Sequence, residues 1–476
     1  MSVADAQANG LRANALGVGA ITFFVVSAAG PLVAMGGGVP VSMLLGNGAG
    51  IPTLFVVVVA MLLPFAAGFT AMAHQVKSAG GFYSFAGRGL GGYAAGGTAT
   101  LAIFSYTSIQ IGLYGLFGSA AAAFLNDAIG LRLPWWLCSA LALGAIGSLG
   151  YRRVDLSARV LSVLVICEYL VVLILDLSVL HKAGTNLSAA SFTPRVFLSG
   201  SPTVGLLMCF TAFIGFEATT IYAEEARDPG RTIPLATYVS LLLIGGFYVF
   251  SSWCMVVAAG QEQLLGMLTA LSDPTTFLFK LADQYVGSWL TLAMRLLFLT
   301  SIFAAMLAFH NSIARYFFAM GRERLLPAVL ARTHPTCRSP HTASVLQTLS
   351  ASLLLLVFAA AGVDPVAFLF ARISSVGTLG IIALMGIASA AVFAYFRGKP
   401  GNFWRVRIFP LLATLALAGV LAFGCVRFDV LAGGVSPFIM WLPVLLPVAV
   451  LLGLALADRL RRRDRVVFQQ LGGMTL

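Results

Sequence analysis

A carboxylate lies inside an apolar stretch of this sequence, directly after a glycine and a phenylalanine. The stretch begins TVGLLMCFTAF, passes through Gly215-Phe216-Glu217 and ends in a charged turn at 224–231. A charged side chain is costly in lipid, so Glu217 is expected to face a cavity or a partner. Gly215 weakens a helix and frees backbone polar groups beside it. These residues predict a broken membrane helix whose free main-chain groups can bind a small polar ligand.

A second break is predicted near the start of the chain, in the stretch ITFFVVSAAGPLVAMGGGVP. Proline lacks an N–H group and clashes with a preceding helical turn, but it suits the first position of a new helix. We therefore expect one half-helix to about Ser27 and a link through Ala28, Ala29 and Gly30. A second half-helix should begin at Pro31. Its N-terminal amides would attract a carboxylate without any basic side chain.

Glu168 is a further carboxylate in the middle of an apolar segment, 158–180. A carboxyl group in a membrane is neutral when protonated and costly when ionised, as a proton carrier requires. The alternative for Glu168 is a structural pair with Arg372 or Arg295. Glu217 also has two interpretations, a ligand or coupling carboxylate, or a packing group that holds the broken helix in shape, and the packing role is slightly favoured.

The composition places these residues in a polytopic membrane protein. Hydrophobic residues make up 59% of the chain and charged residues only 10%, whereas soluble domains carry about 25% charged residues. A membrane span needs about 20 apolar residues. The twelve predicted spans are about 15–46, 50–73, 92–125, 134–151, 158–180, 203–225, 234–260, 286–318, 341–362, 365–396, 408–427 and 436–457.

The basic residues predict the orientation. If the N-terminus is inside, 22 of the 29 lysines and arginines fall in inner segments and 5 in outer ones. This asymmetry predicts a multi-pass protein of the cytoplasmic (inner) membrane with both termini in the cytoplasm. It also explains the net charge of +12 by topology, so no nucleic-acid partner is expected.

Motifs of enzymes and metal sites are not recognised in this sequence. The six cysteines have no metal-ligand or disulfide spacing, and no paired-aspartate metal motif, Gly-x-Ser-x-Gly nucleophile or histidine cluster is found in a span. We expect neither an enzyme nor a bound cofactor or metal.

The two breaks fall in the first and sixth predicted spans. These positions correspond if spans 1–5 and 6–10 are two halves of inverted topology. The predicted organisation is a cytoplasmic tail 1–14, a ten-helix core 15–400 with repeats 15–180 and 203–397, two additional membrane helices 401–460, and a cytoplasmic tail 461–476.

Four motifs resemble those of one transporter family. AFIGFE followed by EEARDPGRTIP resembles the sixth-span signature of the amino acid–polyamine–organocation (APC) transporters. SAGGFYSFAGRGLGGYAAG resembles that family's first inner loop, HNSIARYFFAMGRERLLPAVL the end of span eight, and VGTLGIIALMGIASAAVFAYFR span ten. The resemblance runs from about residue 15 to 400. It implies an all-α fold with a five-plus-five inverted repeat of the leucine-transporter type and two further spans.

The resemblance also implies a substrate and a site. Amino acids or amines would move by alternating access, in a uniporter, an exchanger or a proton symporter. The substrate's carboxylate would meet the span-one amides and its ammonium the carbonyl groups freed in span six. The candidate substrate-binding residues are Ser27, Ala28, Ala29, Gly30, Pro31, Leu32, Tyr106, Thr107, Gln110, Phe213, Ile214, Gly215, Phe216 and Glu217.

Two further roles follow from this resemblance. Some members have a gating tryptophan where this chain has Thr211, so Phe210 and Phe216 are the candidate gate. Some have a lysine near the position of Glu168 that stands in for a sodium ion, so Glu168 is the candidate coupling residue. A proton is therefore a candidate second partner, beside the substrate and the lipid bilayer.

Other functions stay open at this point. An amino acid permease, proton-coupled or exchanging, is favoured. A polyamine or amine permease of the same fold is the first alternative. A channel-like or sensor membrane protein is the second, because broken helices exclude neither. The protein is expected to be a monomer or a homodimer.

Overall fold

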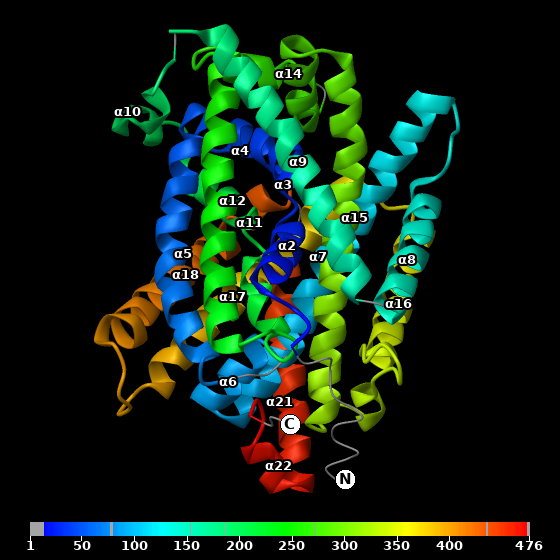
Figure 1. The fold of residues 1–476 in the computed structure, drawn as a ribbon, viewed down its shortest axis with the longest axis vertical. Coiled ribbons are helices and arrows are strands. Elements are labelled where there is room, and N and C mark those ends of the chain that lie inside the picture. The colour runs from blue at the N-terminus through cyan, green and yellow to red at the C-terminus, as the bar shows by residue number, and fades with distance from the viewer. Residues whose placement is uncertain are drawn as a thin grey trace.

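In the computed structural model, the regular structure of the described residues is helical. These residues are 14–76, 80–152, 154–185, 187–271, 273–434 and 437–473. Within them, extended pairing is limited to one isolated bridge, between Leu16 and Ala226. Helices α6 (Phe82–Leu90) and α22 (Arg465–Gln469) lie at one end of the bundle, and α14 (Phe277–Tyr285) lies at the other (Figure 1). We call these the α6 end and the α14 end.

Eleven helices of the described chain are long and apolar enough to cross a membrane, so this is a multi-pass membrane protein. They coincide with eleven of the twelve predicted spans. Their bounds are Val18–Leu45, Gly48–Ala73, Gly92–Ile129, Ser162–Ala183, Pro202–Tyr222, Pro229–Ala259, Ser288–Arg322, His341–Ala360, Pro365–Tyr395, Trp404–Val426 and Ile439–Arg463.

The remaining predicted span, 134–151, is a shorter apolar helix. It forms α8 (Trp135–Arg152), of which Trp135–Tyr151 is apolar. At about 1.5 Å of rise per residue this apolar part is about 26 Å long, slightly less than the roughly 30 Å of a hydrocarbon core. This helix is therefore too short to be counted with the other eleven candidate spans by length alone.

The first span is broken as predicted, but the break is narrower. Helix α2 (Val18–Ala29) continues through both alanines that were expected in the link. Only Gly30 is non-helical, with φ 57° and ψ 72°, and α3 (Pro31–Val33) begins at the proline. The left-handed conformation is open to glycine without steric cost, and it lets the Gly30 N–H close α2 as a helix cap.

Beyond the break the first span is irregular. Helix α3 passes into a π-helical segment, η1 (Ala34–Gly38), and then into α4 (Val39–Leu45). Three of the five residues of η1 are glycines, in the sequence Ala-Met-Gly-Gly-Gly. Because π-helical turns inside helices often occur at functional sites, this segment is a candidate part of a binding surface.

The sixth span is also broken, and earlier than Gly215. Helix α11 (Pro202–Thr211) ends four residues before that glycine, and a turn covers 212–215. A 3₁₀ helix, η4 (Phe216–Tyr222), follows. Gly215 has φ 113°, a conformation that residues with a Cβ atom rarely adopt. Gly215 therefore changes the direction of the chain after α11 has ended.

The long helix α7 (Gly92–Ile129) is the centre of the bundle (Figure 1). One of its neighbours is η7 (Pro365–Ile373), a π-helical segment that leads into α17 (Ser374–Tyr395). A Cβ atom at Gly115 would lie 2.5 Å from the Pro365 carbonyl oxygen, and one at Gly112 would lie 2.8 Å from that of Leu369. The missing side chains allow the two backbones to touch, as small residues do between membrane helices.

Candidate substrate site between two broken helices

The two breaks are in direct contact. A Cβ atom at Gly215 would lie 2.8 Å from the Ala28 Cβ atom and 3.0 Å from the Ala29 nitrogen. A distance below 3.0 Å between such atoms forces one of them to move. The close approach of these segments therefore requires glycine at this position, in addition to its positive φ.

Glu217 holds the sixth-span break together. Its Oε2 atom accepts the Gly215 N–H at 2.8 Å, and its Oε1 atom accepts the Tyr106 hydroxyl of α7 at 2.9 Å. The side chain is only 1% exposed. Both oxygens are thus used inside the protein, and these contacts fit the packing role.

Glu168 lies behind the first-span break. It belongs to α9 (Val154–Ala183), and its Oε2 atom accepts the Ser301 hydroxyl of α15 (Ser288–Arg322) at 2.6 Å. The same oxygen accepts the Leu32 N–H of α3 at 3.4 Å. Its Oε1 atom is buried and has no hydrogen-bond partner among the described residues. Glu168 therefore accepts a hydrogen bond from the Leu32 amide, one of the amides that were predicted to bind a substrate carboxylate.

The two arginines considered as partners of Glu168 have other neighbours. The Arg295 Nη2 atom lies 2.8 Å from the Asp127 Oδ2 atom, in an exposed ion pair. The Arg372 guanidinium lies 5.7 Å from the centre of the Phe368 ring. In the described part of the chain, Glu168 has serine and amide partners and forms no ion pair.

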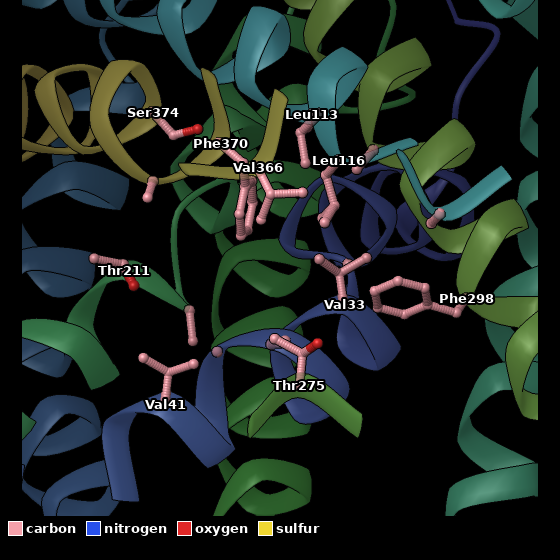
Figure 2. Close-up of a pocket in the computed structure, with 18 of the residues that line it drawn as sticks. Val33, Val41, Leu113, Leu116, Thr211, Thr275, Phe298, Val366, Phe370 and Ser374 are labelled. Carbon is pink, nitrogen blue, oxygen red and sulfur yellow. The ribbon is translucent and has the colours of Figure 1, made fainter. Parts of the chain in front are cut away.

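A cavity of about 530 Å³ lies beside the two breaks. Ala28, Ala29, Gly30 and Ile214 line it where the breaks meet. Val33, Leu113, Leu116, Phe298, Val366 and Phe370 line its walls, and Figure 2 shows these six side chains around one space. They come from α3, α7, α15 and η7. The cavity is thus mostly aliphatic and aromatic near the breaks.

The cavity extends to the α14 end. Its lining includes Asp273, Thr275 and Thr276, next to α14, and Asp273 and Thr276 are exposed. Asp273 and Arg295 are the charged residues among the described lining residues. Asp273 caps the short helix η5 (Pro274–Thr276) by accepting the Thr275 N–H at 2.9 Å. Both charged residues therefore lie in the part of the cavity near the α14 end and have partners there.

The α6 end is closed by two ion pairs, one buried and one half-buried. Glu225, just after η4, accepts two hydrogen bonds from the Arg315 guanidinium of α15, at 3.0 and 2.7 Å. The two side chains are 7% and 1% exposed. Both of these bonds come from the Arg315 Nη2 atom, whereas Arg322 donates to Glu224 from Nη2 and Nη1, at 2.6 and 3.0 Å. The Arg315 guanidinium also lies 4.6 Å from the centre of the Tyr222 ring. The charged turn predicted after span six is therefore fastened to α15.

Other segments add to this closure. The Ala15 and Leu16 amides both donate to the Glu225 carbonyl oxygen at 2.9 Å. Glu323 accepts the Gly472 N–H at 2.6 Å and also the Tyr83 hydroxyl of α6. Burial, the charge of Glu323 and this hydrogen bond raise the pKa of Tyr83 well above its usual value, so its hydroxyl remains a donor.

The predicted site residues fall into two groups. Ala28, Ala29, Gly30 and Ile214 line the cavity. The remaining predicted substrate-binding and gate residues lie outside its lining; they are Ser27, Pro31, Leu32, Tyr106, Thr107, Gln110, Phe210, Phe213, Gly215, Phe216 and Glu217.

Contacts of the second group explain its position. Gln110 donates to the Met306 carbonyl oxygen at 3.0 Å and accepts from Gln347 at 2.6 Å. The Phe213 ring lies 5.6 Å from that of Tyr248, and the Phe216 ring 5.7 Å from that of Phe65. These side chains connect helices to one another. The aromatic residues that do line the cavity, such as Phe298 and Phe370, were not predicted, because nothing distinguishes them within uniformly apolar segments.

The described residues contain no cluster of histidine, cysteine, aspartate or glutamate that could hold a metal ion. Two broken helices that meet at a cavity, closed towards one end and reaching the other, are the arrangement in which secondary transporters of the membrane form their binding site. The chain belongs to the amino acid permease family, whose model matches residues 16–450, and so to the APC superfamily. The predicted family is confirmed, and the protein is a transporter and not an enzyme.

The chain is similar at low sequence identity to several amino acid and amine transporters. The chain is 27% identical over 398 residues to the branched-chain amino acid permease BcaP of Bacillus subtilis (strain 168), covering 78% of each protein. It is 22% identical over 301 residues to the low-affinity putrescine importer PlaP of Escherichia coli (strain K12), covering 61% of this chain and 63% of the importer. It is 27% identical over 136 residues to human cationic amino acid transporter 4, covering 29% and 20%.

Proposed function

We propose that this permease is a secondary active transporter of neutral amino acids with apolar side chains. In this proposal α8 is a twelfth membrane helix, and the chain has two inverted five-helix repeats, 15–180 and 203–397, followed by two further helices. Both termini lie in the cytoplasm, as the basic inner segments indicate. The α14 end then faces outwards, and the structure corresponds to an outward-facing state.

The apolar lining of the cavity is the observation that supports a neutral amino acid with an apolar side chain as the substrate. An amino acid would place its carboxylate and ammonium against main-chain groups of the two breaks and its side chain among Val33, Leu113 and Phe370. A polyamine would bring a second ammonium into the same space. Asp273 lines the cavity only at its exposed end, and Glu168 and Glu217 lie outside the lining and accept hydrogen bonds from the protein. A second ammonium near the breaks would therefore be buried without a counter-ion, which is costly. The resemblance to BcaP over a larger part of the chain supports the same choice.

Glu168 is proposed as the coupling residue. Its carboxylate joins α9 to Leu32 of the first span and to Ser301 of the eighth. Hydrogen bonds to an ionised acceptor are stronger than those to a neutral one. Protonation would therefore weaken both contacts and free the first span to move against α15. In this mechanism one proton accompanies the substrate inwards.

Uptake into proteoliposomes tests the proposal. We expect labelled leucine to accumulate against its gradient and to be displaced by valine and phenylalanine but not by putrescine or lysine. Leucine should raise the melting temperature of the purified protein, because a ligand of the folded state stabilises it. Displacement by putrescine at concentrations like that of leucine would contradict the proposed substrate. Uptake that never exceeds equilibrium would indicate a pore.

Two variants link this transport to the cavity. Val366→Trp should obstruct the cavity beside the breaks and abolish leucine uptake. Val426→Trp is the matched control, because Val426 is 70% exposed and does not line the cavity. Glu168→Gln should retain leucine binding and lose the pH dependence of uptake. A pH profile identical to that of the wild type would remove the proposed role of Glu168.

A further inference from the structure

Asp176 is a second carboxylate buried in α9. It is 1% exposed and accepts the hydroxyl hydrogen of Ser251, in α12 (Pro229–Ala259), at 2.6 Å. None of the ion pairs among the described residues includes Asp176. An ionised carboxylate is costly to bury without a cation, and ionisable residues within membrane segments are functional candidates by default.

The position of Asp176 relates it to Glu168. The two residues are eight positions apart on α9, so they are separated by about 12 Å along the helix axis. Asp176 is the nearer of the two to the helix end at Ala183. That end leads towards the α14 end of the bundle, where the Lys182 Nζ atom lies 4.9 Å from the centre of the Tyr285 ring. Asp176 thus lies between Glu168 and the α14 end.

A hydroxyl-bearing residue lies beside each carboxylate: Tyr169 follows Glu168 on α9, and Ser251 of α12 contacts Asp176. The Tyr169 hydroxyl is buried and has no hydrogen-bond partner among the described residues. The Tyr169 ring lies 4.3 Å from that of Phe247, the neighbour of Tyr248 on α12, and the Tyr248 hydroxyl donates to the Ala212 carbonyl oxygen at 3.2 Å. Tyr248 is one helical turn from Ser251 on α12. We call Tyr169, Tyr248 and Ser251 the hydroxyl seam.

Other titratable groups near α9 are occupied or remote. Helices α2 and α3 carry none. On α14, Lys280 and Asp283 are exposed. On α15, Arg295 pairs with Asp127, and His310 is bonded to Ser344 at 2.9 Å.

On α12, the buried Cys254 lies one helical turn from Ser251, the partner of Asp176. Asp176 and Glu168 are therefore the acidic groups at the two ends of the hydroxyl seam.

We propose that Asp176 is a second proton-binding site, which receives protons from the outer side and passes them through the hydroxyl seam to Glu168. In this transfer the Tyr248 hydroxyl gives up its hydrogen bond to the Ala212 carbonyl oxygen. Each hydroxyl of the seam accepts one proton and releases another, so the net change is one proton moved from the Asp176 carboxyl group to the Glu168 carboxylate. No oxidant or reductant is needed. The inference rests on the proposed role of Glu168 as coupling residue.

Measurements of proton entry and of substrate exchange distinguish a proton-binding role of Asp176 from a structural one. Proteoliposomes with a trapped pH dye would report leucine-driven proton entry, and exchange of labelled for unlabelled leucine would report substrate movement without net proton transfer. In Asp176→Asn we expect loss of proton entry, with exchange and the leucine-induced rise in melting temperature retained. The matched control is Asp283→Asn, which removes an exposed carboxylate from neighbouring α14 and should leave all three readouts unchanged.

Ser251→Ala is the second variant, because it keeps Asp176 and removes the hydroxyl in contact with it. It should slow proton entry while exchange continues, and it decides the matter if Asp176→Asn does not fold. Normal proton entry in Asp176→Asn, or a parallel loss of exchange and proton entry in Ser251→Ala, would overturn the inference. If the wild type exchanges leucine without proton entry, the coupling role of Glu168 falls as well. If only Glu168→Gln loses proton entry, Glu168 keeps its role and Asp176 does not.

Discussion

Replacing Glu225 by glutamine is expected to unlock the α6 end of the protein. The change leaves the Arg315 guanidinium, 1% exposed, without its counter-ion. Breaking a buried ion pair in this way costs about 3–5 kcal/mol. If the pair exists only while the α6 end is closed, this cost falls on the outward-facing state alone. At 1.4 kcal/mol per tenfold change, the population of that state relative to the inward-facing one falls roughly a hundredfold or more.

Labelling of a cysteine in the cavity measures this shift. The six native cysteines are first replaced, and Val366→Cys, which lines the cavity, supplies the only thiol. A membrane-impermeant maleimide added outside should label it readily when Glu225 is present. With Glu225→Gln the labelling rate should fall, because the cavity then faces the cytoplasm in most molecules. The melting temperature should fall as well.

The exposed ion pair at the other end is the control. Arg295 and Asp127 are 42% and 49% exposed, and such pairs contribute about 0–1 kcal/mol. Asp127→Asn should therefore alter neither labelling nor melting temperature appreciably. Combining Glu225→Leu with Arg315→Met removes both buried charges and should recover stability, although not the closed end. Unchanged labelling and melting temperature in Glu225→Gln would refute the assignment of this pair as an inner gate.

Three further changes address other parts of the structure. Gly215→Ala should abolish uptake and lower the melting temperature, because its Cβ atom would clash at the break; Gly246→Ala, with no atom within 4 Å of an added Cβ, should leave both unchanged, and equal effects would contradict this. Val366→Asp should weaken leucine binding and strengthen putrescine binding in a thermal-shift titration, because it supplies a counter-ion; unaltered selectivity would argue against an apolar cavity as the cause. Tyr83→Phe should lower the melting temperature by the same amount at pH 6 and pH 8: the raised pKa of Tyr83 keeps its bond to Glu323 fully formed below the unfolded-state value of about 10, so a loss confined to one pH would contradict it.

The helix breaks and the spans could be predicted from the sequence because their signals are local. The two adjacent residues Gly30 and Pro31 are enough to predict a helix break. Gly215 and Glu217 are easily recognised because the residues around them are apolar. The residues at which each break begins and ends could not be predicted as well. Helix α2 runs on to Ala29 and α11 ends already at Thr211, because packing between the two broken segments, and not alanine or phenylalanine propensity, decides where the last turns form.

The cavity lining could not be predicted in the same way. In a membrane protein both the cavity-facing and the lipid-facing sides of a helix can be apolar, so the sequence of η7 does not reveal that Val366 and Phe370 face inwards. The partner of Glu217 was equally hidden, since Tyr106 is 111 residues away along the chain. Such contacts depend on the rotation of whole helices, which no single stretch of residues encodes.

The direct contact of the α7 backbone with η7 has a consequence for how this family could diversify. Where Gly112 and Gly115 meet this segment, an added Cβ atom would clash with the carbonyl oxygens of Leu369 and Pro365, which have no rotamers to change, so a larger residue would push the two helices apart. Substrate size is more readily retuned from the opposite partner, by exchanging Val366 or Phe370 while the helix spacing is preserved. Variation among related permeases that prefer different side chains should therefore concentrate at those two positions and spare the glycines behind them.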